Sequence, residues 1–175
     1  MTTNYLTPER QEEITQVVEN IKLDVGLDYP ENSLKSIIKH YIPDVLIKES
    51  DFNGNRHIKG AVFRKSKEYA HPVIAIQSHQ TKASKTFAMA HEFAHYVLDH
   101  NPEQNYLIDD RTFDGSSVMQ DETEANFFAQ TLLMPRQEFE KVNFPFISDE
   151  KLAEYFGVSE GAIRVRRQWL ERNGF

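Results

Sequence analysis

The chain has 175 residues, a net charge of −7 and no cysteine. This length fits one domain with a sizeable core and at most a small appendage. The acidic balance argues against a protein whose main task is to bind nucleic acid, and the lack of cysteine excludes disulfides and zinc-thiolate sites. With no signal-peptide pattern and no run of about 20 apolar residues, we expect a cytoplasmic protein with no membrane span.

The first 80 residues predict two helices followed by a small sheet. Thr7 and Pro8 are typical of a helix start, and apolar residues then recur at helical spacing. A second helix is predicted over Ser33 to His40. Short apolar runs rich in β-branched residues predict strands at 45–47, 58–63 and 73–76. We expect Val73 to Ile76 to offer a strand edge to which an extended peptide could add as a further strand.

The most informative motif is His91-Glu92-Phe93-Ala94-His95, which has the form H-E-x-x-H. It lies in a run with helical periodicity, Lys85 to Leu98. Residues four apart share one face of a helix, so His91 and His95 could present two imidazole nitrogens to one zinc ion. Glu92 would then lie beside the metal, where it could take a proton from a water molecule. The alternative is a chance match among the seven histidines of the chain.

A catalytic zinc site needs a third protein ligand, and without cysteine this must be His, Asp or Glu. The nearest histidine is His100. Its distance in sequence from His91 is one residue short of the extended metzincin motif, and Leu98 stands where that motif has glycine. The spacing therefore argues against His100 as the ligand.

A helix predicted over residues 121–133, ended by Pro135, offers better candidates. Glu122 lies on the same stripe as the apolar residues of this helix, where a carboxylate is costly unless it is paired or binds metal. Asn126, one turn later, is placed to hydrogen-bond a ligand. The alternative is that Asp121, Glu122 and Glu124 are first-turn acids favoured by the helix dipole, and spacing alone does not decide.

Together the two motifs resemble the ImmA/IrrE family of bacterial zinc metallopeptidases. The resemblance rests on His91 to His95, on Glu122 to Ala129 with Leu132 to Pro135, and on the apolar turn Phe87 to Ala90. It covers roughly residues 73–175. It implies that Glu122 is the third zinc ligand and Glu92 the general base. The family usually has glycine before its second histidine, where this chain has Ala94.

The resemblance also implies a fold and a substrate. We expect an α+β, zincin-like fold, with a sheet of about three strands packed on the active-site helix and one Zn²⁺ held by His91, His95 and Glu122. Family members cleave or inactivate a helix-turn-helix repressor of the Xre type, which controls mobile-element transfer, phage induction or a stress response. The alternative is a non-catalytic zinc-containing regulatory module that binds a repressor or DNA, although such a module has no need of Glu92 as a base.

Two further regions give open predictions. Residues 101–120 have little periodicity and predict a long loop, either a surface connection or a lid over the substrate cleft. Stabilisation of an oxyanion could come from Tyr96, His100 or Tyr106, and the sequence does not choose among them.

The C-terminal stretch predicts a helix, a tight turn at 157–159 and a second helix, which together resemble a helix-turn-helix. We therefore predict a zincin-like domain over residues 1–145 and a helical appendage over residues 146–175. Arg164, Arg166 and Arg167 lie on the second helix. However, residues 148–175 hold five Lys and Arg against five Asp and Glu. This balance argues against direct DNA binding and favours a packing or partner-docking element.

Overall fold

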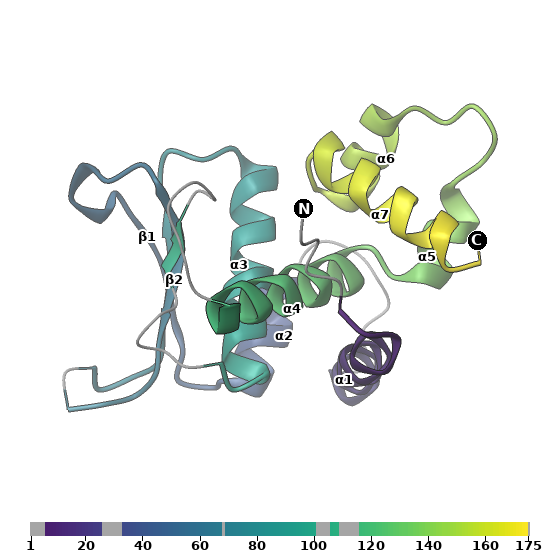
Figure 1. Ribbon diagram of the computed structural model, residues 1–175. Coiled ribbons are helices and arrows are strands. Elements are labelled where there is room, and N and C mark those ends of the chain that lie inside the picture. The colour runs from purple at the N-terminus through teal and green to yellow at the C-terminus, as the bar shows by residue number, and fades with distance from the viewer. Residues whose placement is uncertain (1–5, 26–32, 68, 101–105, 109–115, 175) are drawn as a thin grey trace.

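The computed structural model describes residues 6–25, 33–67, 69–100, 106–108 and 116–174. A mixed sheet lies on one side of the molecule and the helices on the other, as Figure 1 shows, which confirms the expected α+β class. The helices are α1 (Pro8–Val25), α2 (Ser33–Tyr41), α3 (Lys82–Val97), α4 (Ser116–Leu133), α5 (Arg136–Val142), α6 (Asp149–Phe156) and α7 (Glu160–Arg172). The strands are β1 (Leu46–Ser50), β2 (Ile58–Phe63), β3 (Val73–Gln77) and β4 (Tyr106–Ile108), and a short 3-10 helix, η1 (Phe52–Gly54), joins β1 to β2.

The strand that the sequence placed at an edge lies inside the sheet. The strand order is β1-β3-β2-β4, with β3 parallel to β1 and antiparallel to β2. Val73 of β3 pairs with Leu46 on one side and with Phe63 on the other. The expectation that Val73 to Ile76 offers a free edge is therefore wrong, because both sides of β3 are already hydrogen-bonded. The edges of the described sheet are β1 and β4.

The segment predicted as a loop, residues 101–120, contains parts of two regular elements. The short strand β4 pairs with β2, where Ile108 faces Ile58 and Tyr106 faces Ala61 across an irregularity. The last five residues of the segment belong to α4, which starts earlier than the sequence suggested. A strand of three residues is too short to show alternation, so the sequence predicted three strands rather than four. Residues 101–105 and 109–115, and with them most of the possible lid, lie outside the described residues.

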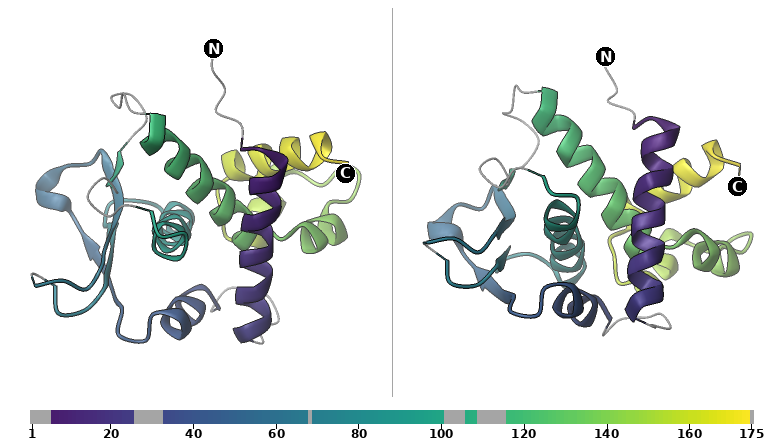
Figure 2. Two further views of the ribbon diagram at one scale, coloured as in Figure 1. Left: turned by 60° about the horizontal axis from the view of Figure 1, so that its bottom comes forward. Right: turned by 90° about the horizontal axis from the view of Figure 1, so that it is seen from below.

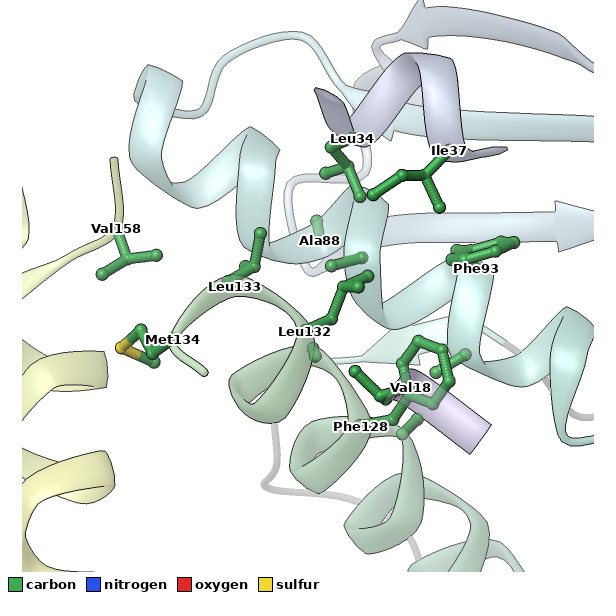
Figure 3. Close-up of a cluster of buried hydrophobic side chains, with 14 of the residues drawn as sticks. Val18, Leu34, Ile37, Ala88, Phe93, Phe128, Leu132, Leu133, Met134 and Val158 are labelled. Atoms are coloured by element: carbon green, nitrogen blue, oxygen red, sulfur yellow. The ribbon is translucent and has the colours of Figure 1, made fainter. Parts of the chain in front are cut away.

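Helix α3 packs on β2 and β3, and α4 crosses over α3. Thr81 starts α3, because its hydroxyl accepts a hydrogen bond from the Ser84 backbone N–H. Both helices bury small side chains that let their backbones approach closely: Ala90, Ala94, Ala125 and Ala129. The rings of Phe93 and Phe128 meet edge to face with centroids 5.9 Å apart, and Figure 3 shows this pair within the core. This close crossing brings the motif on α3 next to the acids on α4.

Helix α1 lies beside α4, as both views of Figure 2 show. Its buried stripe consists of Ile14, Val18 and Ile21, which confirms the predicted amphipathic helix. A hydrogen bond of 3.1 Å from Trp169 Nε1 to Gln11 Oε1 also joins α1 to α7. None of the described helices combines the length and the apolar character needed to cross a bilayer.

The C-terminal helices α6 and α7 form the expected helix-turn-helix-like tail. Gly157, in the left-handed region with φ 65°, ends α6, and the Ser159 hydroxyl caps the start of α7. Helix α5, which the sequence analysis did not predict, packs against this tail. The ring of its Phe139 stacks on that of Phe156 in α6, with centroids 5.5 Å apart. Tail residues thereby belong to the same hydrophobic cluster as α3 and α4.

Arg164, Arg166 and Arg167 of α7 contact other residues of the chain. Arg166 is buried and donates a hydrogen bond of 3.0 Å to the carbonyl of Met134. Arg167 and Arg164 both pair with Asp149. Arg166 thus packs inside the chain, whereas the ion pairs of Arg164 and Arg167 with Asp149 stay partly exposed.

Candidate metal centre

Helices α3 and α4 bring three potential ligands together. His91 and His95 lie one turn apart on α3, and Glu122 extends from α4. The two Nε2 atoms are 2.9 Å apart, and each lies 3.2 Å from one oxygen of the Glu122 carboxylate. Both histidines are buried, whereas Glu122 is partly exposed. The structure thus gathers the three residues that the sequence and the family resemblance put forward as ligands.

This donor set fits one zinc ion. Atoms bonded at about 2.0–2.1 Å to a tetrahedral ion lie about 3.3 Å from one another, close to the separations found here. Two imidazole nitrogens and a carboxylate oxygen are ligands that zinc accepts, and three protein ligands leave a fourth position open. That open position is typical of catalytic rather than structural zinc sites. His91, His95 and Glu122 could therefore hold Zn²⁺.

The other nitrogen of each histidine ring also has a partner. His91 Nδ1 lies 3.0 Å from Asn126 Oδ1, which confirms the predicted contact of Asn126 with a ligand. His95 Nδ1 lies 2.9 Å from His100 Nδ1. Such contacts fix the tautomer and the orientation of a ligating imidazole. His100 therefore contacts the His95 ring from the side away from the triad of His91, His95 and Glu122.

The turn at the end of α3 explains how His100 reaches His95. Asp99 adopts the left-handed conformation with φ 56°, and the His100 backbone N–H donates to the His95 carbonyl at 3.1 Å. This six-residue closure is a Schellman turn, which folds the chain back over the last turn of the helix. The spacing of nine residues between His91 and His100 is one residue short of the metzincin motif. Together with this turn, it places His100 beside His95.

Glu124 lies on the far side of His100. Its Oε2 atom is 3.3 Å from His100 Nε2 and 2.6 Å from Arg10 Nη2, and its Oε1 accepts a hydrogen bond of 3.1 Å from Gln120. The reading of Asp121, Glu122 and Glu124 as first-turn acids is wrong, because α4 begins at Ser116. No pattern in the sequence indicated the contact of Glu124 with Arg10, because the two residues are 114 positions apart.

Glu92 is fully buried beside this triad, and both of its carboxylate oxygens lack a hydrogen-bond partner within the described part of the chain. It packs against Gly60 of β2. A Cβ atom at position 60 would lie 2.7 Å from Glu92 Oε1 and 2.9 Å from its Cγ. Gly60 therefore leaves the space that Glu92 occupies. A glycine inside a strand often marks such a close approach. Gly60 within the predicted strand 58–63 was therefore a sequence signal for this contact.

The pKa shifts agree with a metal-binding role. Burial raises the pKa of Glu122, but hydrogen bonds with His91 and His95 outweigh it and lower this pKa to about 2. Burial lowers the pKa of His95. The ligands are thus an anionic carboxylate and a neutral imidazole, the forms that bind metal. Burial, together with the nearby Glu122 carboxylate, raises the pKa of Glu92 well above its usual range. A cation in the site would favour the ionised form of Glu92.

The three oxyanion candidates have different surroundings. Both ring nitrogens of His100 are engaged, with His95 and Glu124, so it has no free donor for an oxyanion. Tyr96 packs against the Arg64 guanidinium, whose carbon lies 4.5 Å from the ring centre. The side chain of Tyr106 lies outside the described residues.

Two histidines one helical turn apart, a carboxylate from a neighbouring helix and an unpaired glutamate beside the first histidine are the arrangement of H-E-x-x-H metallopeptidases. A family model described as the IrrE N-terminal-like domain, Peptidase_M78, matches residues 43–167. The chain belongs to this family, which confirms the resemblance found in the sequence. The match covers all four strands, α3 and α4, and it begins after α1 and α2.

The fold also resembles a solved structure described as a Mycobacterium tuberculosis transcriptional regulator. The TM-score is 0.58 at 15% sequence identity, and the match covers 89% of this chain and 47% of that protein. At this identity the likeness shows the fold alone. The chain therefore spans about half the length of this structural relative. No curated protein matched the sequence.

The identity of the third ligand can be tested by replacing single acids. We expect Glu122→Gln to weaken zinc binding by more than about 100-fold, because a neutral amide replaces the carboxylate in contact with both Nε2 atoms. Asn126→Ala should weaken zinc binding by about 10–100-fold, the range for a side chain that orients a ligand. Asp121→Asn, a neighbouring change of the same kind, should stay within a few-fold of wild type. Competition with a chromogenic chelator measures all three. Equal losses for Asp121→Asn and Glu122→Gln would contradict the assignment.

Proposed function

We propose that this chain is a zinc-dependent endopeptidase that cleaves a protein substrate. The observation that carries the proposal is the combination of the His91, His95 and Glu122 triad with the unpaired, buried carboxylate of Glu92. A site that only holds a structural ion needs no such carboxylate, and burying an unpaired one is costly. A general base, in contrast, must keep a free oxygen for the proton it takes.

The roles of the residues follow from their contacts. His91, His95 and Glu122 hold the ion, which, when bound, lowers the pKa of water and polarises the scissile carbonyl. Asn126 and His100 orient the two imidazole rings. An oxygen of Glu92 takes the proton of the attacking water and passes it to the leaving amine nitrogen. The lack of a side chain at Gly60 leaves room for this carboxylate.

An extended substrate segment has one suitable edge near these residues. Gly60, which contacts Glu92, lies in β2, and β4 pairs with the other side of β2. In the described sheet the outer side of β4 carries no further strand. A peptide hydrogen-bonded to β4 would extend the sheet by one strand close to the site, which is a common mode of peptide recognition. We therefore place the substrate along β4 rather than along β3.

Membership of this family supports a proposal for the substrate class. We propose that it is a helix-turn-helix repressor of the Xre type, whose cleavage relieves repression of a mobile element, a phage or a stress response. Arg164, Arg166 and Arg167 of α7 contact other residues of the chain, and the tail carries as many acidic as basic residues, so we assign the tail to packing or to contact with this protein partner rather than to DNA.

The proposal is tested with the purified chain and a small Xre-type repressor encoded beside it. We expect about one zinc per chain, and repressor fragments in mass spectra only with the zinc-loaded protein. Removing zinc with a chelator should stop cleavage, and adding one equivalent back should restore it. A repressor that binds the zinc-loaded chain but stays full length would instead support the non-catalytic module. A wild-type chain that takes up no zinc would reject both readings.

A further inference from the structure

A continuous series of polar contacts runs from the metal centre to α1. It begins at His95 Nδ1, 2.9 Å from His100 Nδ1, and continues from His100 Nε2 to Glu124 Oε2 at 3.3 Å. Arg10 Nη2 then donates to the same Glu124 oxygen at 2.6 Å. His95, His100 and Glu124 are all buried, with exposed fractions of 1%, 6% and 4%. Three consecutive buried polar groups thus connect a predicted ligand to an arginine on another helix.

The positions of the hydrogens in this series follow if His95 binds zinc through its Nε2 atom. The hydrogen of His95 is then on Nδ1, which donates to His100 Nδ1. His100 then carries its own hydrogen on Nε2 and donates to Glu124. Glu124 accepts as a carboxylate, and the Arg10 guanidinium supplies the positive charge beside it. Every donor in the series therefore has an acceptor, and any other tautomer of His100 would place two lone pairs or two hydrogens against each other.

The two histidines are supported in different ways. Within the described residues, His91 Nδ1 contacts the amide oxygen of Asn126 on α4. His95 is supported by His100, which contacts Glu124, and Glu124 in turn pairs with Arg10. Arg10 belongs to α1, which lies outside the residues that the family model matches. Without Arg10, the buried carboxylate of Glu124 would lose its charged partner, although Gln120 would remain.

We propose that Arg10, Glu124 and His100 are positioning residues that hold His95 in its metal-binding tautomer, and that α1 is therefore part of the metal centre. This inference rests on the proposed zinc site but not on peptide hydrolysis. It predicts that zinc affinity depends on a side chain of α1 that does not touch the ion.

The test compares variants on one helix. Arg10→Ala is expected to weaken zinc binding by about 10–100-fold, the range for a side chain that supports a ligand. Arg10→Lys keeps the charge and should recover most of the loss. Glu13→Ala removes the other, exposed partner of Arg10, and Gln11→Ala removes the contact of α1 with Trp169, so both should bind zinc within a few-fold of wild type. Zinc affinity is measured by chelator competition, and thermal unfolding of the zinc-free proteins checks that each variant is folded.

Nitrogen NMR of the histidine rings gives a readout that loose packing alone would not change. In zinc-loaded wild type and in Gln11→Ala, we expect the hydrogen of His95 on Nδ1 and that of His100 on Nε2. In the zinc-free proteins, where no ion holds the hydrogen of His95 on Nδ1, wild type should keep the hydrogen of His100 on Nε2, whereas Arg10→Ala should give a mixture of His100 tautomers. Wild-type affinity and tautomers in Arg10→Ala would overturn the inference, as would an equal loss of affinity in Gln11→Ala. A wild type that binds zinc without cleaving the repressor would reject only the proposed function, since affinity and tautomers are read without it.

Discussion

Replacing Glu92 with glutamine is expected to lower peptide hydrolysis by about 10²–10⁴-fold while zinc stays bound. The amide keeps the size of the side chain and its place against Gly60, but it cannot take a proton from water. None of the three ligands changes, so metal content should match that of wild type. The measurement is a repressor cleavage assay, with metal analysis of the same preparations. Glu140→Gln, an equivalent change at an exposed ion pair with Arg136, serves as the control and should leave the rate unchanged.

The same variant separates an enzyme from a binder. Glu92→Gln should still capture the repressor, because β4 and the tail are untouched, but it should no longer relieve repression in cells. Suppose instead that wild type and Glu92→Gln relieve repression equally well and the repressor stays full length. The site would then serve to hold a binding surface together, and the peptidase mechanism would be wrong.

A methyl group at position 60 is expected to impair catalysis without removing the metal. In Gly60→Ala the new Cβ would lie 2.7 Å from Glu92 Oε1, so the carboxylate must move. Overpacking of this kind costs about 1–3 kcal/mol of stability. A displacement of about 1 Å in a catalytic group can lower the rate by about 100-fold. We therefore expect a loss of about 100-fold in kcat with zinc content unchanged.

The matched control for Gly60→Ala is Gly161→Ala in α7. A Cβ atom there would lie 3.7 Å from Ser159 Oγ, an ordinary van der Waals distance, so activity should be unaffected. Thermal unfolding distinguishes a displaced carboxylate from a general loss of structure. Full activity in Gly60→Ala would show that catalysis does not require Glu92 in the position observed here.

Much of the metal site could be predicted from the sequence because its first part is local. His91 and His95 are four residues apart in a run with helical periodicity, and this spacing alone places both on one face. The same periodicity placed Glu122 on the packed side of the next long helix, but it did not decide between a metal ligand and a first-turn acid favoured by the helix dipole. In the structure, Glu122 contacts His91 and His95, and Glu124 contacts His100.

In the sheet, the sequence predicted a strand but not the neighbours of that strand. The apolar run Val73 to Ile76 correctly predicted a buried strand, since such a run has no polar face. It could not show that β1 and β2 flank this strand, because hydrogen-bond partners in a sheet are set by segments distant in sequence. The free edge was therefore assigned to β3 rather than to β4.

The sequence by itself determined the two helices that carry the ligands, the H-E-x-x-H pair and the family. Only the tertiary structure decided which surfaces of these elements meet. Gly60 lies against Glu92, and Arg10 reaches Glu124 from a helix 114 positions away in the chain. The physical reason is that periodicity records which face of an element is buried, whereas the partner on that face depends on how the helices and the sheet pack together.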